Sequence, residues 1–319
     1  MNDLLIREAN VDDSIEIVSL LKNTLGESLL PKTVDYWNWK HYHNPFGISK
    51  IIVATFNNEI IGVRAFLKWK WQNKYTTINA IRAVDTATAK EFQSRGVFKK
   101  LTLFALAQCK SEGIDLVFNT PNKISKPGYI KMGWEENGRM PIQIKPCFHI
   151  PSKFNEHFVD NIYAEFPVND FATQFNEYMD FSNHGVKFNT VFSEKYYKWR
   201  YADCPTVEYG FKGCVDKYFI FFRLKKIDKF IELRICDFWI KNEKGLEKSF
   251  LDGLTQLVKK ISPLFISFAP DFRINFKNGL WFNTNKGPIT TVRKLSSERV
   301  EDFLYFKNWQ PSIGSMELF

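Results

Sequence analysis

An internal repeat is the feature of this sequence that most restricts its fold. Residues 36–45, Tyr-Trp-Asn-Trp-Lys-His-Tyr-His-Asn-Pro, resemble residues 196–205, Tyr-Tyr-Lys-Trp-Arg-Tyr-Ala-Asp-Cys-Pro, at an offset of 160. Further along the chain, residues 82–85 (Arg-Ala-Val-Asp) match residues 234–237 (Arg-Ile-Cys-Asp). Because the matches keep the same order and similar offsets, we interpret the chain as two copies of one domain.

The two copies are predicted to meet in a stretch punctuated by Pro141, Pro146 and Pro151. We therefore expect a first domain over residues 1–148 and a second over residues 149–319. A total of 319 residues suits two domains of ordinary size. The composition, 45% hydrophobic and 25% charged, excludes a disordered or collagen-like chain.

The first copy alternates between strand and helix patterns. It opens with a strand over residues 4–9 and a helix that begins at Asp13, with Glu16 as the partner in a capping box. A long strand over residues 75–88 precedes a helix that ends at Gly113. The predicted order is β-α-α-β-β-β-α-β-α-β. The other elements are a helix that ends at Asn44-Pro45, a hairpin of residues 51–56 and 60–69, a buried strand over residues 114–119 and a short helix before Gly133.

The junction between the long strand and its helix has the features of an anion site. Residues 92–98 read Phe-Gln-Ser-Arg-Gly-Val-Phe. A glycine at such a turn lets backbone N–H groups converge, and the helix N-terminus adds its positive dipole end. Arg95, Lys99 and Lys100 supply further positive charge. The pattern therefore predicts a binding site for a diphosphate.

These motifs resemble those of the GNAT acyltransferase superfamily. Its coenzyme A loop, Gln/Arg-x-x-Gly-x-Gly/Ala, is matched by residues 93–98, with Phe98 in place of the small last residue. The family's segment Asn…Tyr-x-Lys-x-Gly-Phe is matched from Asn122 through Tyr129 to Trp134. The resemblance, carried by residues 4–150, implies an α/β (α+β) protein with two tandem GNAT-like domains. Each would be a mixed, mostly antiparallel twisted sheet flanked by helices.

The second copy lacks the Gln-x-x-Gly spacing after Asp237. We therefore expect one acyl-CoA site, in the first domain, with the second domain as a scaffold and one wall of the acceptor pocket. The resemblance implies that the amine attacks the thioester directly and that the strand end binds pantetheine. The residues that it assigns to coenzyme A are Thr86, Ala87, Thr88, Gln93, Ser94, Arg95, Gly96, Val97, Phe98, Lys99, Asn119, Asn122, Ser125 and Tyr129.

Tyr129, Asp85 and His41 are the candidates for catalysis. Tyr129 matches the family's proton donor to the leaving thiolate, although a packing tyrosine is an equal alternative. Asp85 lies where many family members keep an acid, but Asp237 repeats it, which favours a structural role. His41 has no histidine counterpart in the second copy, and a neutral imidazole suits proton removal. The candidates for binding the acceptor are Trp37, Trp69, Trp71, Arg82 and His43, with a core position as the alternative for the tryptophans and a structural role for Arg82.

The net charge of +9 and the pI near 9.1 suit substrates that carry phosphate groups. The segment from Tyr36 to Gly47, with residues 121–125, resembles GNAT proteins of bacterial surface-polysaccharide pathways, including lipopolysaccharide O-antigen biosynthesis. That resemblance implies an acceptor such as dTDP-3-amino-3,6-dideoxyhexose and an acetyl or larger acyl group, for example 3-hydroxybutanoyl. The alternatives are a peptidoglycan-type aminoacyl-tRNA-dependent transferase, a protein lysine acetyltransferase and a non-catalytic binding module.

Other classes of protein find little support in the sequence. The basic residues are dispersed rather than clustered, which weakens the case for nucleic acid. The five cysteines are scattered without a Cys-x-x-Cys pair, so we expect neither a disulfide framework nor a metal site. No apolar run is long enough to span a bilayer, and the N-terminal residues do not resemble a signal peptide. These features predict a cytoplasmic protein.

Overall fold

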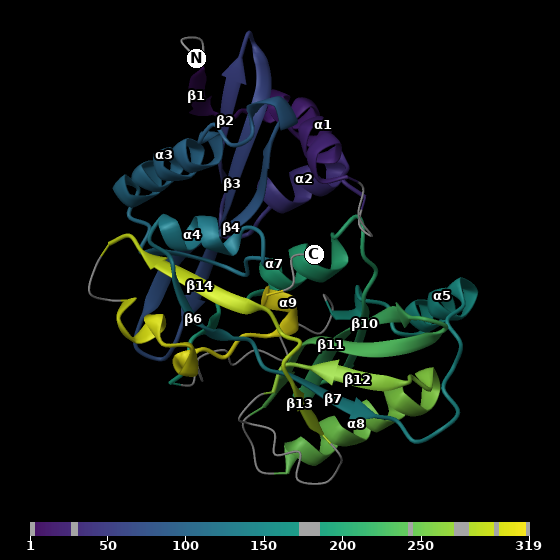
Figure 1. Cartoon of the computed structure of the whole chain (residues 1–319). Helices are drawn as coiled ribbons and strands as arrows, with labels where there is room; N and C mark the ends of the chain where they lie inside the picture. Colours follow the sequence, from purple (N-terminus) through teal and green to yellow (C-terminus); the bar gives the residue numbers. More distant parts are fainter. Residues whose placement is uncertain are drawn as a thin grey trace.

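The computed structural model describes residues 4–26, 31–171, 186–241, 245–270, 281–296 and 300–316. Two twisted sheets, each with helices against it, form two halves of the molecule (Figure 1). The first sheet confirms the predicted order of elements. Its strands, in spatial order, are β1 (Leu5–Glu8), β2 (Lys50–Phe56), β3 (Glu59–Gln72), β4 (Thr77–Thr88), β5 (Leu116–Asn119), β14 (Ile289–Lys294) and β6 (Glu135–Arg139), with β8 (Asn189–Thr190) paired to β3.

The first sheet is buried on both faces because its strands alternate apolar side chains between two layers of helices. Ile51 and Val53 of β2 pack with the apolar side chains of α1 (Ser14–Leu25), on the face that α2 (Val34–His41) also covers. Ile52 of the same strand faces the other way. It packs in the cluster formed by α3 (Val97–Ser111) and α4 (Lys126–Lys131).

The second sheet is covered on one face by two helices and faces the first half with the other. Its strands, in spatial order, are β13 (Phe282–Thr284), β7 (Ile142–Pro146), β12 (Phe265–Phe268), β11 (Phe230–Ile240), β10 (Tyr218–Ile227) and β9 (Gly210–Cys214). The covering helices are α5 (Glu156–Glu165) and α8 (Leu246–Ile261). The elements on the inner face are α7 (Glu194–Tyr197), the π-helical turn Lys198–Ala202 and α9 (Ile313–Met316), which follows the short turns η5 (Asp302–Leu304) and η6 (Phe306–Asn308).

Two strands lie in the sheet of the other half. β7 comes from the end of the predicted first domain, yet it pairs with β12 and β13 in the second sheet. β14 comes from the predicted second domain, yet it lies between β5 and β6 in the first sheet. The domain boundary at residue 148 stays a prediction from the sequence repeat. The two hydrogen-bonded sheets are not divided at that residue, since each contains a strand from the other side of it.

The repeat is visible in the strand register. In the first sheet, β4 and β5 pair in parallel, and Arg82 opposite Phe118 is the last pair. In the second sheet, β11 and β12 also pair in parallel, and Arg234 opposite Ser267 is the last pair. Both sheets therefore open at the same point of the repeated sequence, just before the aspartate that ends each match.

The two copies also touch through equivalent residues. The Trp39 indole donates to the carbonyl of Trp199 at 2.6 Å, and the Trp199 indole donates to the carbonyl of Trp39 at 2.8 Å. Their rings stack with centroids 5.0 Å apart. A reciprocal contact of this kind places the two copies about a local twofold axis.

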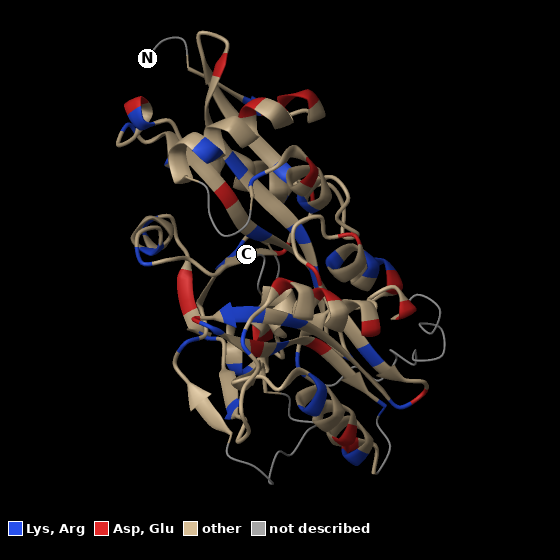
Figure 2. Ribbon diagram, turned by 90° about the vertical axis from the view of Figure 1, so that its right-hand side faces the viewer, with Lys and Arg blue, Asp and Glu red and all other residues tan. Residues whose placement is uncertain are grey.

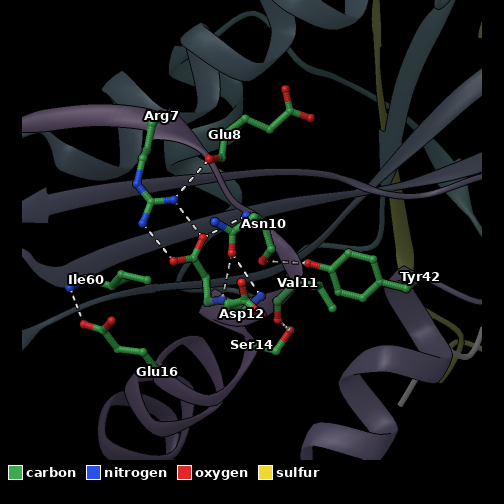
Figure 3. A network of polar contacts seen from close by, with 10 residues as sticks. Arg7, Glu8, Asn10, Val11, Asp12, Ser14, Glu16, Tyr42 and Ile60 are labelled. Atoms are coloured by element: carbon green, nitrogen blue, oxygen red, sulfur yellow. Dashed lines mark hydrogen bonds and ion pairs between the residues drawn. The ribbon is translucent and has the colours of Figure 1, made fainter.

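The N-terminal capping box lies three residues earlier than the sequence predicts (Figure 3). Asn10 is the N-cap, and its side chain accepts from the backbone of Asp12 and Asp13 in η1 (Val11–Asp13). The Asp13 carboxylate accepts a hydrogen bond from the backbone N–H of Asn10 and forms an ion pair with Arg7. Glu16 instead accepts from the backbone N–H of Ile60, so it ties α1 to β3.

The aspartate of the second copy, Asp237, predicts a pH dependence of stability. It is buried, and its Oδ2 accepts from the hydroxyls of Tyr201 and Tyr196. Burial raises its pKa to about 6. Between about pH 4 and pH 6 the folded chain therefore holds this proton more tightly than the unfolded chain, and the contribution of Asp237 to stability falls as pH rises.

We expect Asp237→Asn to become more stable relative to the wild type as pH rises from 4 to 7. The relative gain in the free energy of unfolding is about 3 kcal/mol, since two pKa units correspond to that energy. Denaturant unfolding of both proteins across this range measures it. Asp203→Asn, which alters an exposed ion pair with Lys198, is the control. A constant difference between Asp237→Asn and wild type would contradict the prediction.

Candidate active site

The site begins where β4 and β5 separate. β4 continues from Ala83 to Thr88 beyond its last pair with β5, while its other edge stays bonded to β3. A bulge in β4 places Val84 and Asp85 opposite the single residue Ala65. The edge of β4 that faces the gap can therefore pair with an extended chain of amides, as an added strand would. This geometry fits the pantetheine arm of coenzyme A.

The turn after β4 is shaped for an anion. Gln93, which follows η2 (Lys90–Phe92), donates through Nε2 to the Thr88 carbonyl at 3.0 Å. Ser94 and Gly96 both have left-handed backbones, with φ of 61° and 78°. Gly96 is the N-cap of α3, and a Cβ added there would meet nothing within 4 Å. The turn therefore leaves room beside the first N–H groups of α3, the groups of a helix that a diphosphate can bind.

Positive charge lies beside this turn without collecting into one large patch. Arg95, Lys99 and Lys100 are exposed, and the Arg95 guanidinium lies 5.6 Å from the centre of the Phe92 ring. Over the molecule as a whole, basic and acidic residues are interspersed along both halves (Figure 2). The charge is thus suited to a small phosphorylated ligand more than to a long polyanion.

Tyr129 lies on α4 beside the gap. Its side chain is buried, and its hydroxyl accepts a hydrogen bond from Arg64 Nη1 at 2.8 Å. Its ring makes an edge contact with Phe98, with centroids 5.7 Å apart. Phe98, the residue that departs from the family's loop, therefore packs on the tyrosine. The structure brings the loop of α3 and the predicted proton donor of α4 together.

Three polar residues assigned to coenzyme A by resemblance make bonds within the protein. The Asn122 side chain accepts from the backbone N–H groups of Ile124 and Ser125, at 3.0 and 2.8 Å. Asn119 is buried, and its amide oxygen accepts from the Thr291 hydroxyl of β14. These bonds shape the turn before α4 and fasten β14 to β5. Their side chains contribute to the site through the position of α4.

A cavity of about 530 Å³ lies between the two sheets, at the opening of β4 from β5. From the first sheet it is lined by Arg82 to Asp85 and by Lys40. The second sheet adds Arg234 and Ser267, and the segment before β14 adds Lys286. The lining carries four cationic side chains and one carboxylate. Lys40 pairs with that carboxylate, Asp85, and Arg234 pairs with the buried Glu232, so the remaining positive charge comes from Arg82 and Lys286 and favours a ligand with negative charge.

Asp85 is the acid of this cavity, and two residues of α2 hold it. Lys40 Nζ lies 2.7 Å and His41 Nε2 lies 2.9 Å from Asp85 Oδ2. The Asp85 side chain is 27% exposed, whereas that of His41 is fully buried. Lys40 and the hydrogen bond from His41 hold the pKa of Asp85 well below its usual range, against the effect of burial. Asp85 is therefore ionised at neutral pH.

His41 lies behind Asp85 and away from the cavity lining. Its Nδ1 is 2.9 Å from the Ser49 hydroxyl, so both ring nitrogens have partners. Burial lowers the pKa of His41, against the effect of Asp85, and the imidazole is neutral at pH 7. Asp85 therefore lines the cavity, and His41 holds it from behind through a hydrogen bond that fixes the orientation of the carboxylate.

The tryptophans predicted to bind the acceptor are core residues, which corrects that expectation. Trp37 is 3% exposed, and Trp69 and Trp71 are 1% and 0% exposed. The Trp69 indole donates to the Thr190 hydroxyl of β8, and Trp71 packs against Trp309. Side chains this deep offer almost no surface to a ligand.

The other two residues predicted to bind the acceptor lie in different places. His43 is exposed and does not line the cavity. Arg82 does line it, and it donates to the carbonyls of Ser315 and Met316 in α9 and to the Thr120 hydroxyl. Burial lowers the pKa of Arg82 to about 10, which leaves it charged.

Lys40, Arg234 and Lys286 line the cavity but were not predicted as site residues from the sequence. A signal existed for the first two, since Lys40 matches Arg200 in the repeat and Arg82 matches Arg234. For Lys286 there was none, because it reaches the cavity only through the path of the chain toward β14.

Within the described ranges, no group of three or more His, Cys, Asp or Glu side chains is arranged to hold a metal ion. The same described ranges hold no helix that is both long and apolar enough to cross a membrane.

Comparisons with known proteins agree with this geometry. Residues 5–136 match the model of an acetyltransferase (GNAT) domain. No curated protein sequence matches the chain. Similar solved structures include a GCN5-related N-acetyltransferase from Anabaena variabilis, with a TM-score of 0.61 and 13% identity over 92% of this chain and 73% of that one.

Two further structures share the fold. A probable N-acyltransferase of unknown function from Enterococcus faecalis has a TM-score of 0.63 and 9% identity, over 92% of this chain and 73% of that one. Eis1 from Mycobacterium abscessus has a TM-score of 0.56 and 9% identity, over 93% and 75%. Residues 5–136, which hold the gap beside β4 and the turn at Gly96, therefore match a GNAT acetyltransferase domain, and the chain shares the fold of these N-acyltransferase structures.

Proposed function

We propose that the protein transfers an acetyl or larger acyl group, such as 3-hydroxybutanoyl, from coenzyme A to the amine of a nucleotide-linked amino sugar. The observation that carries this proposal is the cavity between the sheets. It reaches Asp85 at the opening of β4, and Arg234 and Lys286 line it from beyond the first half of the chain. An amine at Asp85 with a diphosphate toward these cations would match its charges.

In this proposal the first half of the chain binds the donor. The edge of β4 from Ala83 to Thr88 would pair with pantetheine, and the N–H groups that follow Gly96 would bind the diphosphate. Val97, Phe98 and Lys99 form the first turn of α3 there. The donor supplies a thioester carbonyl, and a strand N–H of β4 would stabilise the oxyanion that forms on it.

Asp85 would act on the amine. As the nitrogen attacks the carbonyl it becomes positively charged, and the ionised carboxylate beside it stabilises that charge until the proton leaves to solvent. Lys40 and His41 would keep Asp85 ionised and oriented, so we assign both to positioning. Tyr129 would give a proton to the leaving sulfur.

The acceptor is tested with Lys286→Glu. We expect this change to raise the KM for a dTDP-linked amino sugar at least about tenfold with little change in kcat, because it reverses one charge–phosphate contact. The matched control is Lys110→Glu, which makes the same charge change at an exposed position on α3. Steady-state kinetics with a panel of acyl-CoA donors measures both variants.

Three outcomes would contradict the proposal. Turnover of peptide amines with none for any nucleotide-linked amino sugar would indicate a protein acetyltransferase. Binding of aminoacyl-tRNA without binding of coenzyme A would indicate the tRNA-dependent alternative. Binding of coenzyme A or a sugar nucleotide without any turnover would indicate a binding module.

A further inference from the structure

Arg64 is a buried cation that has no acidic partner in the part of the chain that the structure describes. It lies on β3 with 0% exposure, and its guanidinium sits 4.4 Å from the Phe66 ring centre, 5.6 Å from that of Phe98 and 5.3 Å from that of Tyr129. Its hydrogen bonds within the described ranges are the one to the Tyr129 hydroxyl and a long one of 3.4 Å to the Val84 carbonyl. Among the described residues, Nε and Nη2 have no hydrogen-bond partner.

The repeat shows that the fold does not need a charge here. Arg64 pairs with Thr86 across β3 and β4. The corresponding pair in the second sheet is Ile220 with Phe238, across β10 and β11. Ile220 is as fully buried as Arg64. An apolar side chain therefore fills this position in the copy that lacks the coenzyme A loop. Replacing a buried charge with an apolar side chain of similar size is often neutral or stabilising.

The direction of the hydrogen bond tells how Arg64 can act. A guanidinium only donates, so the Tyr129 oxygen is the acceptor and its own hydrogen must point elsewhere. Val84, which Arg64 also contacts, lines the cavity and lies past the last pair of β4 with β5. The bond with Arg64 therefore leaves the phenol hydrogen for another acceptor, and Arg64 connects this hydroxyl to the strand segment at the gap where the thioester would lie.

We propose that Arg64 is a positioning residue for the leaving sulfur: it fixes Tyr129 as a proton donor and stabilises the thiolate with its charge. In the step, the amine nitrogen forms a bond to the carbonyl carbon and the C–S bond breaks, leaving its electron pair on sulfur. Tyr129 transfers its proton to that sulfur and regains one from solvent, while the amine nitrogen, whose positive charge Asp85 stabilises, loses its proton to solvent. The inference rests on the acyl-CoA reaction and does not depend on which amine is the acceptor.

Binding experiments test the inference without any acceptor. Coenzyme A and desulfo-coenzyme A are titrated into wild type and Arg64→Met by calorimetry, from pH 7 to pH 9.5. We expect wild type to prefer coenzyme A by about tenfold at the upper end, where the thiol of pKa roughly 8.5 ionises. Arg64→Met should bind both ligands within about twofold of each other, since it cannot stabilise the thiolate.

Kinetics with any amine that the wild type accepts gives the second arm. Tyr129→Phe should lower kcat about 100-fold, and Arg64→Met about 30-fold, with an unchanged or higher melting temperature. The double variant should be no slower than about threefold below Tyr129→Phe, because most of the effect of Arg64 on the transfer step acts through the tyrosine and only the remainder through its charge. Arg64→Lys, which keeps the charge, should recover part of the loss and covers the case in which Arg64→Met does not fold.

The outcomes separate this inference from the proposed acceptor. Wild-type kcat and sulfur preference in Arg64→Met, or in Arg64→Lys if the first does not fold, would overturn the role of Arg64. So would losses that multiply in the double variant. If tighter binding of coenzyme A than of desulfo-coenzyme A depends on Arg64, but nucleotide-linked amino sugars are not turned over, the inference is supported and the proposed acceptor is contradicted. No binding of coenzyme A by the wild type would overturn both.

Discussion

Gly96→Glu is expected to abolish the rise in melting temperature that coenzyme A gives the wild-type protein. Gly96 is the N-cap of α3 with φ of 78°, a backbone that a glutamate adopts only with strain. The new carboxylate would also lie among the N–H groups proposed to bind the diphosphate. At a ligand concentration about 100 times Kd, binding stabilises the protein by about 2.7 kcal/mol, and a 100-fold loss of affinity removes most of that.

The second copy provides the matched control for this experiment. Gly245 is the N-cap of α8, has φ of 92°, and would also place a Cβ in open space. Gly245→Glu therefore introduces the same strain and the same charge at the equivalent helix end. We expect it to keep the wild-type response to coenzyme A. Equal loss in both variants, or no loss in either, would mean that the donor does not bind at Gly96.

Asp85→Asn is expected to lower kcat by about 100-fold or more, because preorganised charges at a reacting centre commonly contribute that much. The amide keeps an oxygen that can accept from Lys40 and His41, so the local packing should survive. What is lost is the negative charge facing the cavity. Single-turnover rates with saturating acyl-CoA measure the effect on the chemical step.

The control for Asp85→Asn again comes from the repeat. Asp237→Asn makes the same change at the equivalent position of the second sheet, where Tyr201 and Tyr196 surround the carboxylate. We expect its kcat to stay within about twofold of wild type, because the side chain is buried in the core and does not line the cavity. If Asp85→Asn retained the wild-type kcat, the carboxylate at the opening of β4 would have only a structural role.

Local patterns predicted the elements of the first half well. The order of strands and helices, the turn at Gly96 and the helix carrying Tyr129 all depend on hydrophobic period and on glycine positions within a few residues. The same locality explains the shift of the capping box. Asn10 and Asp13 fit that motif as well as Asp13 and Glu16 do, and only the contact of Glu16 with Ile60 decides between them.

Long-range contacts account for what the sequence did not reveal. On β3, Trp69 and Trp71 alternate with lysines, a pattern typical of a strand with one face toward a ligand or solvent. In the structure, Thr190 and Trp309 from the second half of the chain cover them. A covering segment more than a hundred residues away leaves no trace in a local pattern. About half of the residues that line the cavity could not be predicted from the sequence for the same reason, because they come from the second half of the chain.

The exchanged strands β7 and β14 determine how this protein can be dissected. A fragment cut at residue 148 would carry β7 without its partners and would lack β14, which separates β5 from β6. Its sheet would end in two unpaired edges beside the reaction gap, the kind of edge that promotes aggregation. Each half therefore needs the other to complete its sheet. We expect the intact chain to unfold in a single cooperative transition, and we expect neither half to fold as an active enzyme on its own.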